Sequence, residues 1–181
     1  GSGHKLCGPT GIGFLWSRKE ILEKIPPLFG GGEMIQDVFE ETSTWAELPH
    51  KFEAGTPAIA EAIGLAEAIN YINNIGLNEI HEYEKTITKY LFEKLNQIEN
   101  IEIIGPSPEI DPDRASLATF YIKNIHSNDI AEILDSKGIC IRSGHHCCQP
   151  LHRYIGIKST ARISMNFTTN KEEIDMFIEK L

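Results

Sequence analysis

Residues 117–142, with the sequence LATFYIKNIHSNDIAEILDSKGICIR, decide the fold that we predict for the second half of the chain. The segment Leu117–Ile122 is rich in apolar and aromatic residues and predicts a strand. Ser127–Ser136 is a predicted helix that ends at Gly138. The apolar positions that this helix would bury are Ile130, Ile133 and Leu134. A further strand begins at Ile139, so the order strand, helix, strand predicts an α/β domain.

The same pattern continues on both sides of this stretch. Ile101–Ile104 predicts a strand, and Ala161–Phe167 predicts another. Thr169 or Asn170 opens a last helix, whose acidic first turn is what the helix dipole favours. We therefore predict fold class α/β, with a two-layer domain over residues 101–181 in which helices cover one face of a sheet.

Residues 57–100 predict two connecting helices. Thr56 is the predicted N-cap of the first helix, with Pro57 as its first residue and Gly76 as its end. Asn78 is the predicted cap of the second helix. We interpret the apolar faces of both helices as core, and these faces consist of Ile59, Ile63, Leu65, Ala66, Ile69 and Ile72, and of Ile80, Tyr83, Ile87, Tyr90, Leu91 and Leu95.

Residues 1–56 have a less regular pattern. Ile12–Trp16 predicts a short strand, and Ser17 with Glu20 predicts a capping box for a short helix. From Leu28 to Thr56, glycines, prolines and scattered acids predict loops or a hairpin.

The composition excludes several classes of partner. The chain has 181 residues, of which 41% are hydrophobic and 24% charged, as in an ordinary globular protein. The formal net charge of −9 would repel nucleic acid and anionic lipid, so we expect neither as a partner.

No apolar run is long enough for a bilayer, and the first residues lack the plan of a signal peptide, so we expect a soluble protein. Cysteines at positions 7, 140, 147 and 148 lack the spacing of a secreted disulfide framework, which favours a reducing compartment.

The stretch Arg142-Ser143-Gly144-His145-His146-Cys147-Cys148-Gln149-Pro150 gathers two thiols, two imidazoles and a guanidinium. Gly144 permits an unusual backbone turn and Pro150 stops regular structure, so we predict that Cys147 lies on a loop. Loops on rigid scaffolds often carry nucleophiles. Because the neighbouring guanidinium and imidazoles are groups that stabilise a thiolate, Cys147 is the candidate nucleophile.

Two other interpretations of this cluster are open. The first is an incidental group of polar residues on a loop. The second is a zinc site with His152 as a further ligand. Adjacent Cys147 and Cys148 cannot easily point at one tetrahedral ion, and no C-x-x-C or H-x-x-x-H pair is present, so we predict no metal. A disulfide between the adjacent cysteines would be strained, and we expect none.

Arg142 and Arg162 lie at the ends of two neighbouring predicted strands. Two guanidinium groups at this place would bind a carboxylate through paired hydrogen bonds. The alternative is two surface arginines that pair with local acids.

Four motifs follow one another along the chain, namely Ser2-Gly3-His4-Lys5 with Gly8-Pro9-Thr10-Gly11, Phe52-Glu53-Ala54-Gly55-Thr56-Pro57, Arg142-Ser143-Gly144-His145-His146-Cys147, and Ala161-Arg162. Together they resemble the Suf-type cysteine desulfurases, a group II, selenocysteine lyase-like class of fold-type I enzymes that use pyridoxal 5'-phosphate. The resemblance runs from end to end of the chain and covers the C-terminal part of such an enzyme. It implies the tail of the large cofactor-binding domain over residues 1–56, connecting helices over 57–100, and the small C-terminal domain with the nucleophilic cysteine loop over 101–181.

The resemblance implies cofactor contacts in the first segment. Lys5 would hold the cofactor covalently and later move protons at the α-carbon of the substrate, with His4 and Ser2 as further cofactor contacts. Thr56 would donate to the cofactor phosphate of the neighbouring subunit, which implies a homodimer. A helix N-terminus at Thr56 would favour the same anion on independent grounds.

The resemblance also implies the roles of the later residues. Arg162 would grip the substrate carboxylate, and Arg142 would assist near the same anion or the sulfur. Cys147 would attack the sulfur of L-cysteine, become a persulfide and leave L-alanine. The implied function is a cysteine desulfurase that supplies a Suf-type sulfur-acceptor protein for iron-sulfur cluster assembly, in the cytoplasm or a plastid stroma.

Two features modify this expectation. Cys148 stands where such enzymes often have alanine or threonine, which leaves open which thiol carries the persulfide. The family draws on residues upstream of Lys5 for several cofactor contacts, so we expect this chain alone to bind the cofactor weakly or not at all and to be inactive. A selenocysteine lyase and a non-catalytic module that docks a sulfur-acceptor protein are the alternatives.

Overall fold

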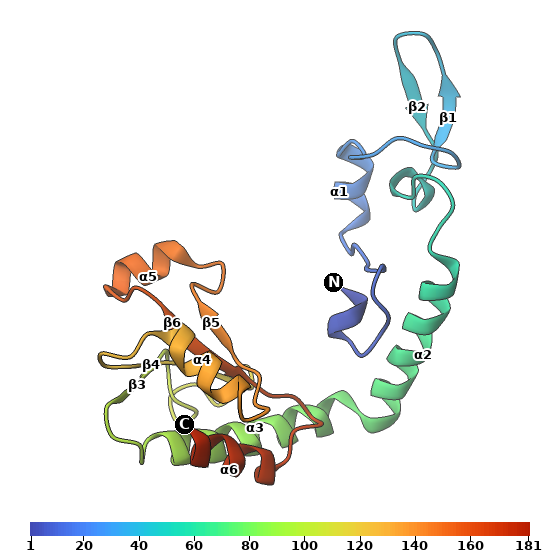
Figure 1. Cartoon of the computed structure of the whole chain (residues 1–181). Helices are drawn as coiled ribbons and strands as arrows, with labels where there is room; N and C mark the ends of the chain where they lie inside the picture. The colour runs from blue at the N-terminus through green and yellow to red at the C-terminus, as the bar shows by residue number, and fades with distance from the viewer. The chain divides into compact units, whose positions relative to one another are not determined.

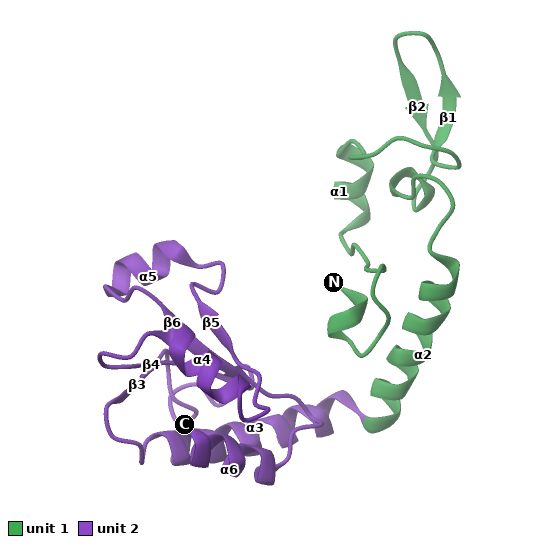
Figure 2. Ribbon diagram, viewed as in Figure 1, with its two compact units in different colours: residues 1–75 green, residues 76–181 purple.

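The computed structural model describes residues 1–181 and divides into two compact units, Gly1–Ile75 and Gly76–Leu181 (Figure 2). The predicted connecting segment 57–100 falls in both units. Its first helix, α2 (Ile59–Ile75), belongs to the first unit, and its second helix, α3 (Leu77–Leu95), belongs to the second.

The second unit is built on a four-stranded sheet in the order β3-β4-β6-β5, with antiparallel neighbours throughout (Figure 1). The predicted bounds of β3 (Ile101–Ile104) and β4 (Leu117–Ile122) are confirmed. The strand predicted from Ile139 is β5 (Arg142–Gly144), which begins three residues later, and the strand predicted at 161–167 is the shorter β6 (Thr160–Ser164).

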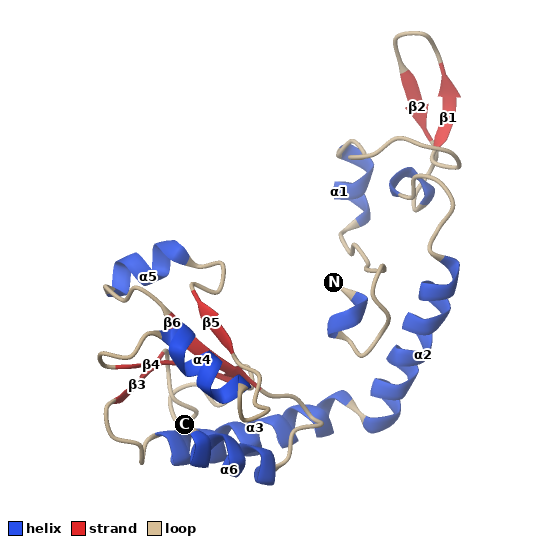
Figure 3. Cartoon of the chain, viewed as in Figure 1, coloured by secondary structure: helices blue, strands red, loops and turns tan.

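One face of this sheet carries the core. Ala118 and Phe120 of β4 lie opposite Ile163 and Ala161 of β6, and all four side chains are buried. Helices α3, α4 (Ser127–Asp135) and α6 (Lys171–Lys180) pack on this face and supply most of the remaining residues of one hydrophobic cluster (Figure 3). Full burial of a side chain such as Phe120 contributes about 1.5–3 kcal/mol. The predicted two-layer arrangement, with helices on one face, is confirmed.

The helix ends of this unit follow local signals in part. Asn170 caps α6 in a complete capping box, because its side chain accepts from the Glu173 N–H at 2.9 Å and the Glu173 carboxylate accepts from the Asn170 N–H at 2.9 Å. The cap predicted at Asn78 is wrong, because α3 begins at Leu77 after Gly76, whose φ of 99° favours glycine. The predicted burial of Ile133 is also wrong, since its side chain is 56% exposed.

The sequence did not predict helix α5 (Gln149–Ile155). We expected Pro150 to stop regular structure, but it stands in the first turn of this helix. Proline fits there because the first helical N–H groups have no intrahelical partner. Gly156, at φ 76°, ends the helix in the left-handed conformation.

The first unit contains short elements. In chain order before α2 they are η1 (Gly3–Lys5), α1 (Lys19–Lys24), β1 (Ile35–Val38), β2 (Ser43–Trp45) and η2 (His50–Phe52). The hairpin of β1 and β2 confirms the hairpin alternative for residues 28–56. The strand predicted over Ile12–Trp16 is wrong, since only Gly13 forms an isolated bridge, to Ser2. The capping box predicted at Ser17 is also wrong, because Arg18 is the N-cap of α1 and makes no side-chain cap bond.

Helix α2 begins later than predicted and buries a narrower face. Its first residue is Ile59, so Thr56 is not its N-cap and Pro57 precedes it. The buried positions are Leu65, Ala68 and Ile72, whereas Ile59 and Ile63 are 60% and 68% exposed. The helix carries its own apolar side chains on most sides, so the sequence pattern did not specify which face packs within the unit.

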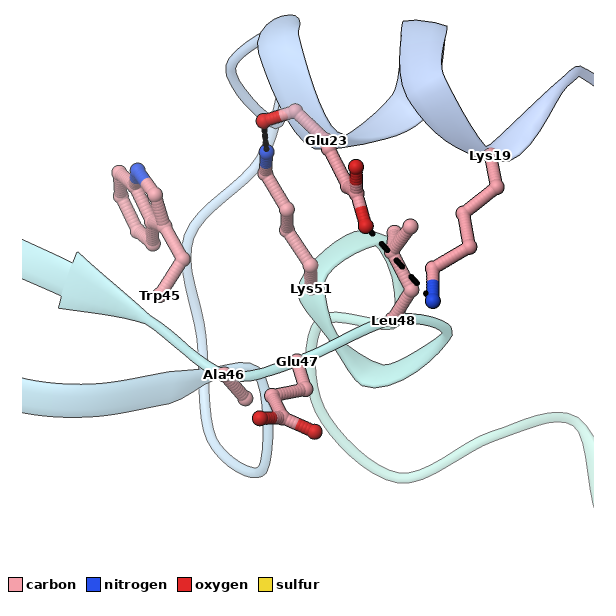
Figure 4. Close-up of a pocket in the computed structure, with 7 residues that line it drawn as sticks. All are labelled: Lys19, Glu23, Trp45, Ala46, Glu47, Leu48 and Lys51. Carbon is pink, nitrogen blue, oxygen red and sulfur yellow. Dashed lines mark hydrogen bonds and ion pairs between the residues drawn. The ribbon is translucent and has the colours of Figure 1, made fainter.

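Lys51 joins two elements of the first unit. Its Nζ donates to the backbone carbonyls of Leu22 and Glu23, each at 3.0 Å, at the C-terminal end of α1. Figure 4 shows the bond to Glu23. A cation at this end satisfies carbonyls that lack helical partners and complements the helix dipole. The hollow beside it, of about 380 Å³, is lined by Lys19, Glu23, Trp45, Ala46, Glu47, Leu48 and Lys51, and contains none of the predicted site residues.

No helix of either unit combines the length and apolar character that a membrane span requires.

Candidate active site

The predicted site residues form two groups, one in each unit. Ser2, His4, Lys5 and Thr56 belong to the first unit, and Arg142, Cys147 and Arg162 belong to the second.

Cys147 lies at an exposed, tightly wound turn between β5 and α5. The Cys148 N–H donates to the His145 carbonyl at 2.8 Å, and the two residues enclosed by this bond, His146 and Cys147, have φ values of 51° and 61°. Such left-handed backbone costs about 1–3 kcal/mol for each residue other than glycine, so the surrounding contacts must hold it. The predicted loop position of Cys147 is confirmed, and its sulfur is at the surface.

Arg142 contacts this sulfur directly. Its Nη2 donates to Cys147 Sγ at 3.4 Å, which places a positive charge beside the sulfur. The contact joins the last strand before the turn to the nucleophile that follows it.

Arg142 and Arg162 are directly opposite each other in the β5–β6 register, so their side chains leave the same face of the sheet. This face is opposite to the core face, which holds Ala161 and Ile163. Arg162 Nε donates to Ser164 Oγ at 3.2 Å, and neither arginine forms an ion pair with an acid. The alternative of two arginines neutralised by local acids is therefore wrong, and the pair presents positive charge that suits a carboxylate.

A buried hydroxyl supports the turn from behind. Thr160 Oγ1 is 3.0 Å from His146 Nε2 and 3.0 Å from His152 Nε2. His152 Nδ1 in turn is 3.1 Å from the Cys148 carbonyl. From the sequence, His152 was predicted only as an alternative zinc ligand, and Thr160 was not predicted as a site residue. The one local signal was the four-residue spacing of Cys148 and His152, which suits the first turn of a helix.

The charge state of His146 depends on this environment. Burial lowers its pKa below the usual value, and the positive charges of Arg162 and Arg142 lower this pKa further, while a hydrogen bond to the Thr160 backbone acts in the opposite direction. The neutral imidazole is thereby favoured beside the candidate nucleophile.

An open hollow of about 490 Å³ adjoins the turn. Its lining residues are Arg142, Ser143, His145, His146, Cys147, Gln149, Pro150 and Arg153. A small substrate that enters it meets the thiol of Cys147 and the guanidinium of Arg142 together.

The Ser2–Lys5 segment of the first unit is held by its backbone. The Gly3 N–H donates to the Ile12 carbonyl at 2.9 Å, and the Gly8 N–H donates to the Gly3 carbonyl at 3.0 Å. A Cβ at Gly3 would lie 2.9 Å from Ile12 Cγ2, so this close approach needs glycine. The segment thus presents exposed His4 and Lys5, and the Lys5 amine has no carboxylate partner.

Thr56 is exposed and its hydroxyl makes no hydrogen bond within the chain. We expected an anion site at Thr56 because a helix N-terminus was predicted there. Helix α2 begins at Ile59, so this structural argument for an anion site at Thr56 fails. The role of this residue rests on the motif alone.

The sequence and fold match known proteins over nearly the whole chain. A probable cysteine desulfurase of Synechocystis sp. is 54% identical over 180 residues, and one of Staphylococcus epidermidis is 48% identical over 180 residues. Each alignment covers 99% of this chain and 43% of the relative, so the chain spans less than half the length of these relatives.

Solved structures agree with this comparison. The cysteine desulfurase CsdA of Escherichia coli (S-sulfonic acid) has a TM-score of 0.89 at 32% identity, over 99% of this chain and 43% of that one. The apo cysteine desulfurase of Thermococcus onnurineus NA1 has a TM-score of 0.90 at 39% identity, over 98% and 44%. A C-DES mutant with glycine covalently linked to its PLP cofactor shares the fold, with a TM-score of 0.78 at 23% identity, over 97% and 42%.

The family model for the class-V aminotransferases matches residues 1–177. With a match over nearly its entire length, this chain belongs to the class-V aminotransferase family.

Proposed function

We propose that this chain carries the sulfur-accepting part of a cysteine desulfurase, which converts L-cysteine to L-alanine and leaves a persulfide on Cys147. The observation that carries the proposal is the exposed Cys147 thiol, which accepts a hydrogen bond from Arg142 at 3.4 Å beside an unpaired second arginine, Arg162. Relatives with 54% and 48% identity that are named probable cysteine desulfurases support it.

The first unit fits pyridoxal 5'-phosphate as the cofactor. The amine of Lys5 is exposed and unpaired, as covalent attachment of a carbonyl cofactor requires, and Ser2 and His4, which precede it in the chain, offer a hydroxyl and an imidazole. Thr56 offers a free hydroxyl for a phosphate. When bound, this cofactor supplies an electron sink that allows the carbon–sulfur bond of the substrate to break.

The residues of the second unit would bind the substrate and take its sulfur. Arg162 and Arg142 bind the carboxylate of L-cysteine and neutralise its charge. The Cys147 thiolate then forms a bond to the substrate sulfur while the carbon–sulfur bond breaks, and the electron pair of that bond stays with the carbon. A proton replaces sulfur on this carbon, which gives L-alanine, and Lys5 is the residue that we expect to move protons there.

We further propose that the protein is of the Suf type and acts as a homodimer in a reducing compartment, either the cytoplasm or a plastid stroma. The motif order of the sequence supports this subtype. In this setting the persulfide on Cys147 passes to a sulfur-acceptor protein for iron-sulfur cluster assembly, and the exposure of Cys147 gives such a partner access.

The test uses a full-length protein that contains this chain, together with pyridoxal phosphate and L-cysteine. We expect L-alanine and a protein persulfide, both abolished by Cys147→Ser and retained by the matched control Cys148→Ser. Alanine formation that survives Cys147→Ser would show that the nucleophile is wrongly assigned. Docking without persulfide formation would favour a non-catalytic module, and a faster reaction with L-selenocysteine alone would favour a selenocysteine lyase.

A further inference from the structure

The Thr160 hydroxyl is the centre of a buried chain of hydrogen bonds behind the candidate nucleophile. Thr160 is 0% exposed and His152 is 5% exposed. The hydroxyl oxygen is 3.0 Å from Nε2 of His152 and 3.0 Å from Nε2 of His146. A hydroxyl has one proton to donate, so at most one of the two imidazoles accepts from it and the other must donate to it.

The Cys148 carbonyl fixes the direction of this chain of bonds. A carbonyl only accepts, so His152 Nδ1, at 3.1 Å, carries a proton. A neutral imidazole carries a proton on only one nitrogen, so with Nδ1 protonated the Nε2 of His152 is bare and accepts from Thr160. The Thr160 oxygen then accepts from the Nε2–H of His146.

An independent feature agrees with this assignment. The assignment places the one proton of neutral His146 on Nε2 and leaves its Nδ1 without a proton. The structure shows this Nδ1 buried without any hydrogen-bond partner. Protonation of His146 would place an N–H at this enclosed position. Burial and the charges of Arg162 and Arg142, which lower the pKa of His146, oppose that protonation.

The same chain of bonds holds both neighbours of Cys147. It reaches the side chain of His146 on one side and the carbonyl of Cys148 on the other, and Cys148 is also the N-cap of α5. The residue between them has a left-handed backbone at φ 61°. The hydroxyl of β6 thus connects to both ends of the turn that presents the thiol.

We propose that Thr160 and His152 are positioning residues, which together fix the tautomer of His146 and clamp the turn that presents Cys147. Only the consequence for sulfur transfer rests on the proposed function. The chain of hydrogen bonds from His146 through Thr160 and His152 to the Cys148 carbonyl, which we call the relay, is a property of the folded protein. It is tested without any assay of catalysis.

The test is nitrogen NMR of the 181-residue chain with labelled histidines, with the His146 signals assigned through His146→Gln. Wild type is expected to show one His146 tautomer, protonated at Nε2. Thr160→Val is expected to lose this single tautomer, and Thr160→Ser to restore it. Thr88→Val is the matched control, because Thr88 is also buried and also bonds to a hydroxyl, that of Ser116 at 3.0 Å, outside the relay.

Two results would overturn the relay. One is a wild-type His146 ring protonated at Nδ1. This measurement uses only the wild-type chain and so does not depend on whether any variant folds. The other is a Thr160→Val chain with a dispersed spectrum and an unchanged Nε2–H tautomer. Because neither result depends on alanine formation, failure of the relay and failure of the proposed function are observed separately.

Discussion

The two units differ in how they bury apolar side chains. In the second unit, one cluster from the sheet and from α3, α4 and α6 encloses thirteen buried residues, among them Phe120 at 0% exposure. In the first unit the buried apolar side chains are Met34, Leu65, Ala68 and Ile72, while Phe14, Leu15, Trp16, Leu28, Phe29, Val38 and Phe39 are exposed. The thiol loop therefore lies on a self-contained core, whereas the Lys5 segment is held mainly by backbone hydrogen bonds and close glycine contacts.

The largest effect is expected from the core of the second unit. Phe120→Ala removes a buried ring that packs edge-on against Phe177, with centroids 6.2 Å apart. We expect the free energy of unfolding to fall by about 3–5 kcal/mol, because a cavity replaces the ring. Hydrogen exchange of the β4 and β6 amides measures this loss. Phe14→Ala, at a position 54% exposed, is the control in the first unit; equal losses from both changes would contradict the comparison.

A smaller effect is expected at the helix ends. Asn170→Ala removes the capping box of α6, and we expect a loss of about 1 kcal/mol in the free energy of unfolding. Urea unfolding followed by circular dichroism measures it. Arg18→Ala at the N-cap of α1, which has no side-chain cap bond, is expected to change stability by less than about 0.5 kcal/mol. A larger loss at Arg18 than at Asn170 would reverse the proposed difference between the units.

The contact between Arg142 and Cys147 is exposed and therefore weaker than a buried one. Arg142→Gln is expected to slow alkylation of Cys147 by iodoacetamide about two- to fivefold, as a partly screened interaction of about 0.5–1 kcal/mol implies. The rate is followed in a Cys148→Ser background by mass spectrometry of the peptide that contains Cys147, which is fragmented to locate the modified thiol. Arg153→Gln changes a cation that lines the same hollow without contacting the sulfur, and a similar slowing there would indicate a general effect of charge.

The smallest effect concerns pH. Because the pKa of His146 is lowered on folding, the unfolded chain binds more protons than the folded chain once the pH falls below the ordinary value of about 6.5. Stability of the second unit should therefore decrease between about pH 7.5 and about pH 5.5. Urea midpoints at both values measure the decrease, which His146→Gln should reduce and His4→Gln, in the first unit, should not. An unchanged dependence in His146→Gln would show that other groups cause it.

Local patterns predicted the elements that are fixed by local chemistry. The bounds of β3 and β4 were correct because apolar runs end there at turn residues, and the cap at Asn170 followed from the acids after it. The candidate thiol and the two arginines were selected from their residue types together with their predicted places on a loop and at strand ends.

Features that depend on distant contacts were not predictable in this way. The direct pairing of Arg142 with Arg162 requires the β5–β6 register, and the relay joins Thr160 to residues 8 and 14 positions away. The exposed face of α2 was misassigned because apolar residues surround most of that helix, and packing decides which of them are buried. Helix α5 was not predicted because a proline occurs both in the first turn of helices and in loops, and the sequence alone does not distinguish the two.

The position of the transferred sulfur tests the central proposal most directly. A full-length protein that contains this chain is incubated with L-cysteine, and the peptide from Ser143 to Arg153 is fragmented in a mass spectrometer, since it contains both Cys147 and Cys148. We predict one added sulfur atom on Cys147, which persists in Cys148→Ser. An added sulfur on Cys148 alone, or no added sulfur while alanine is released, would contradict it.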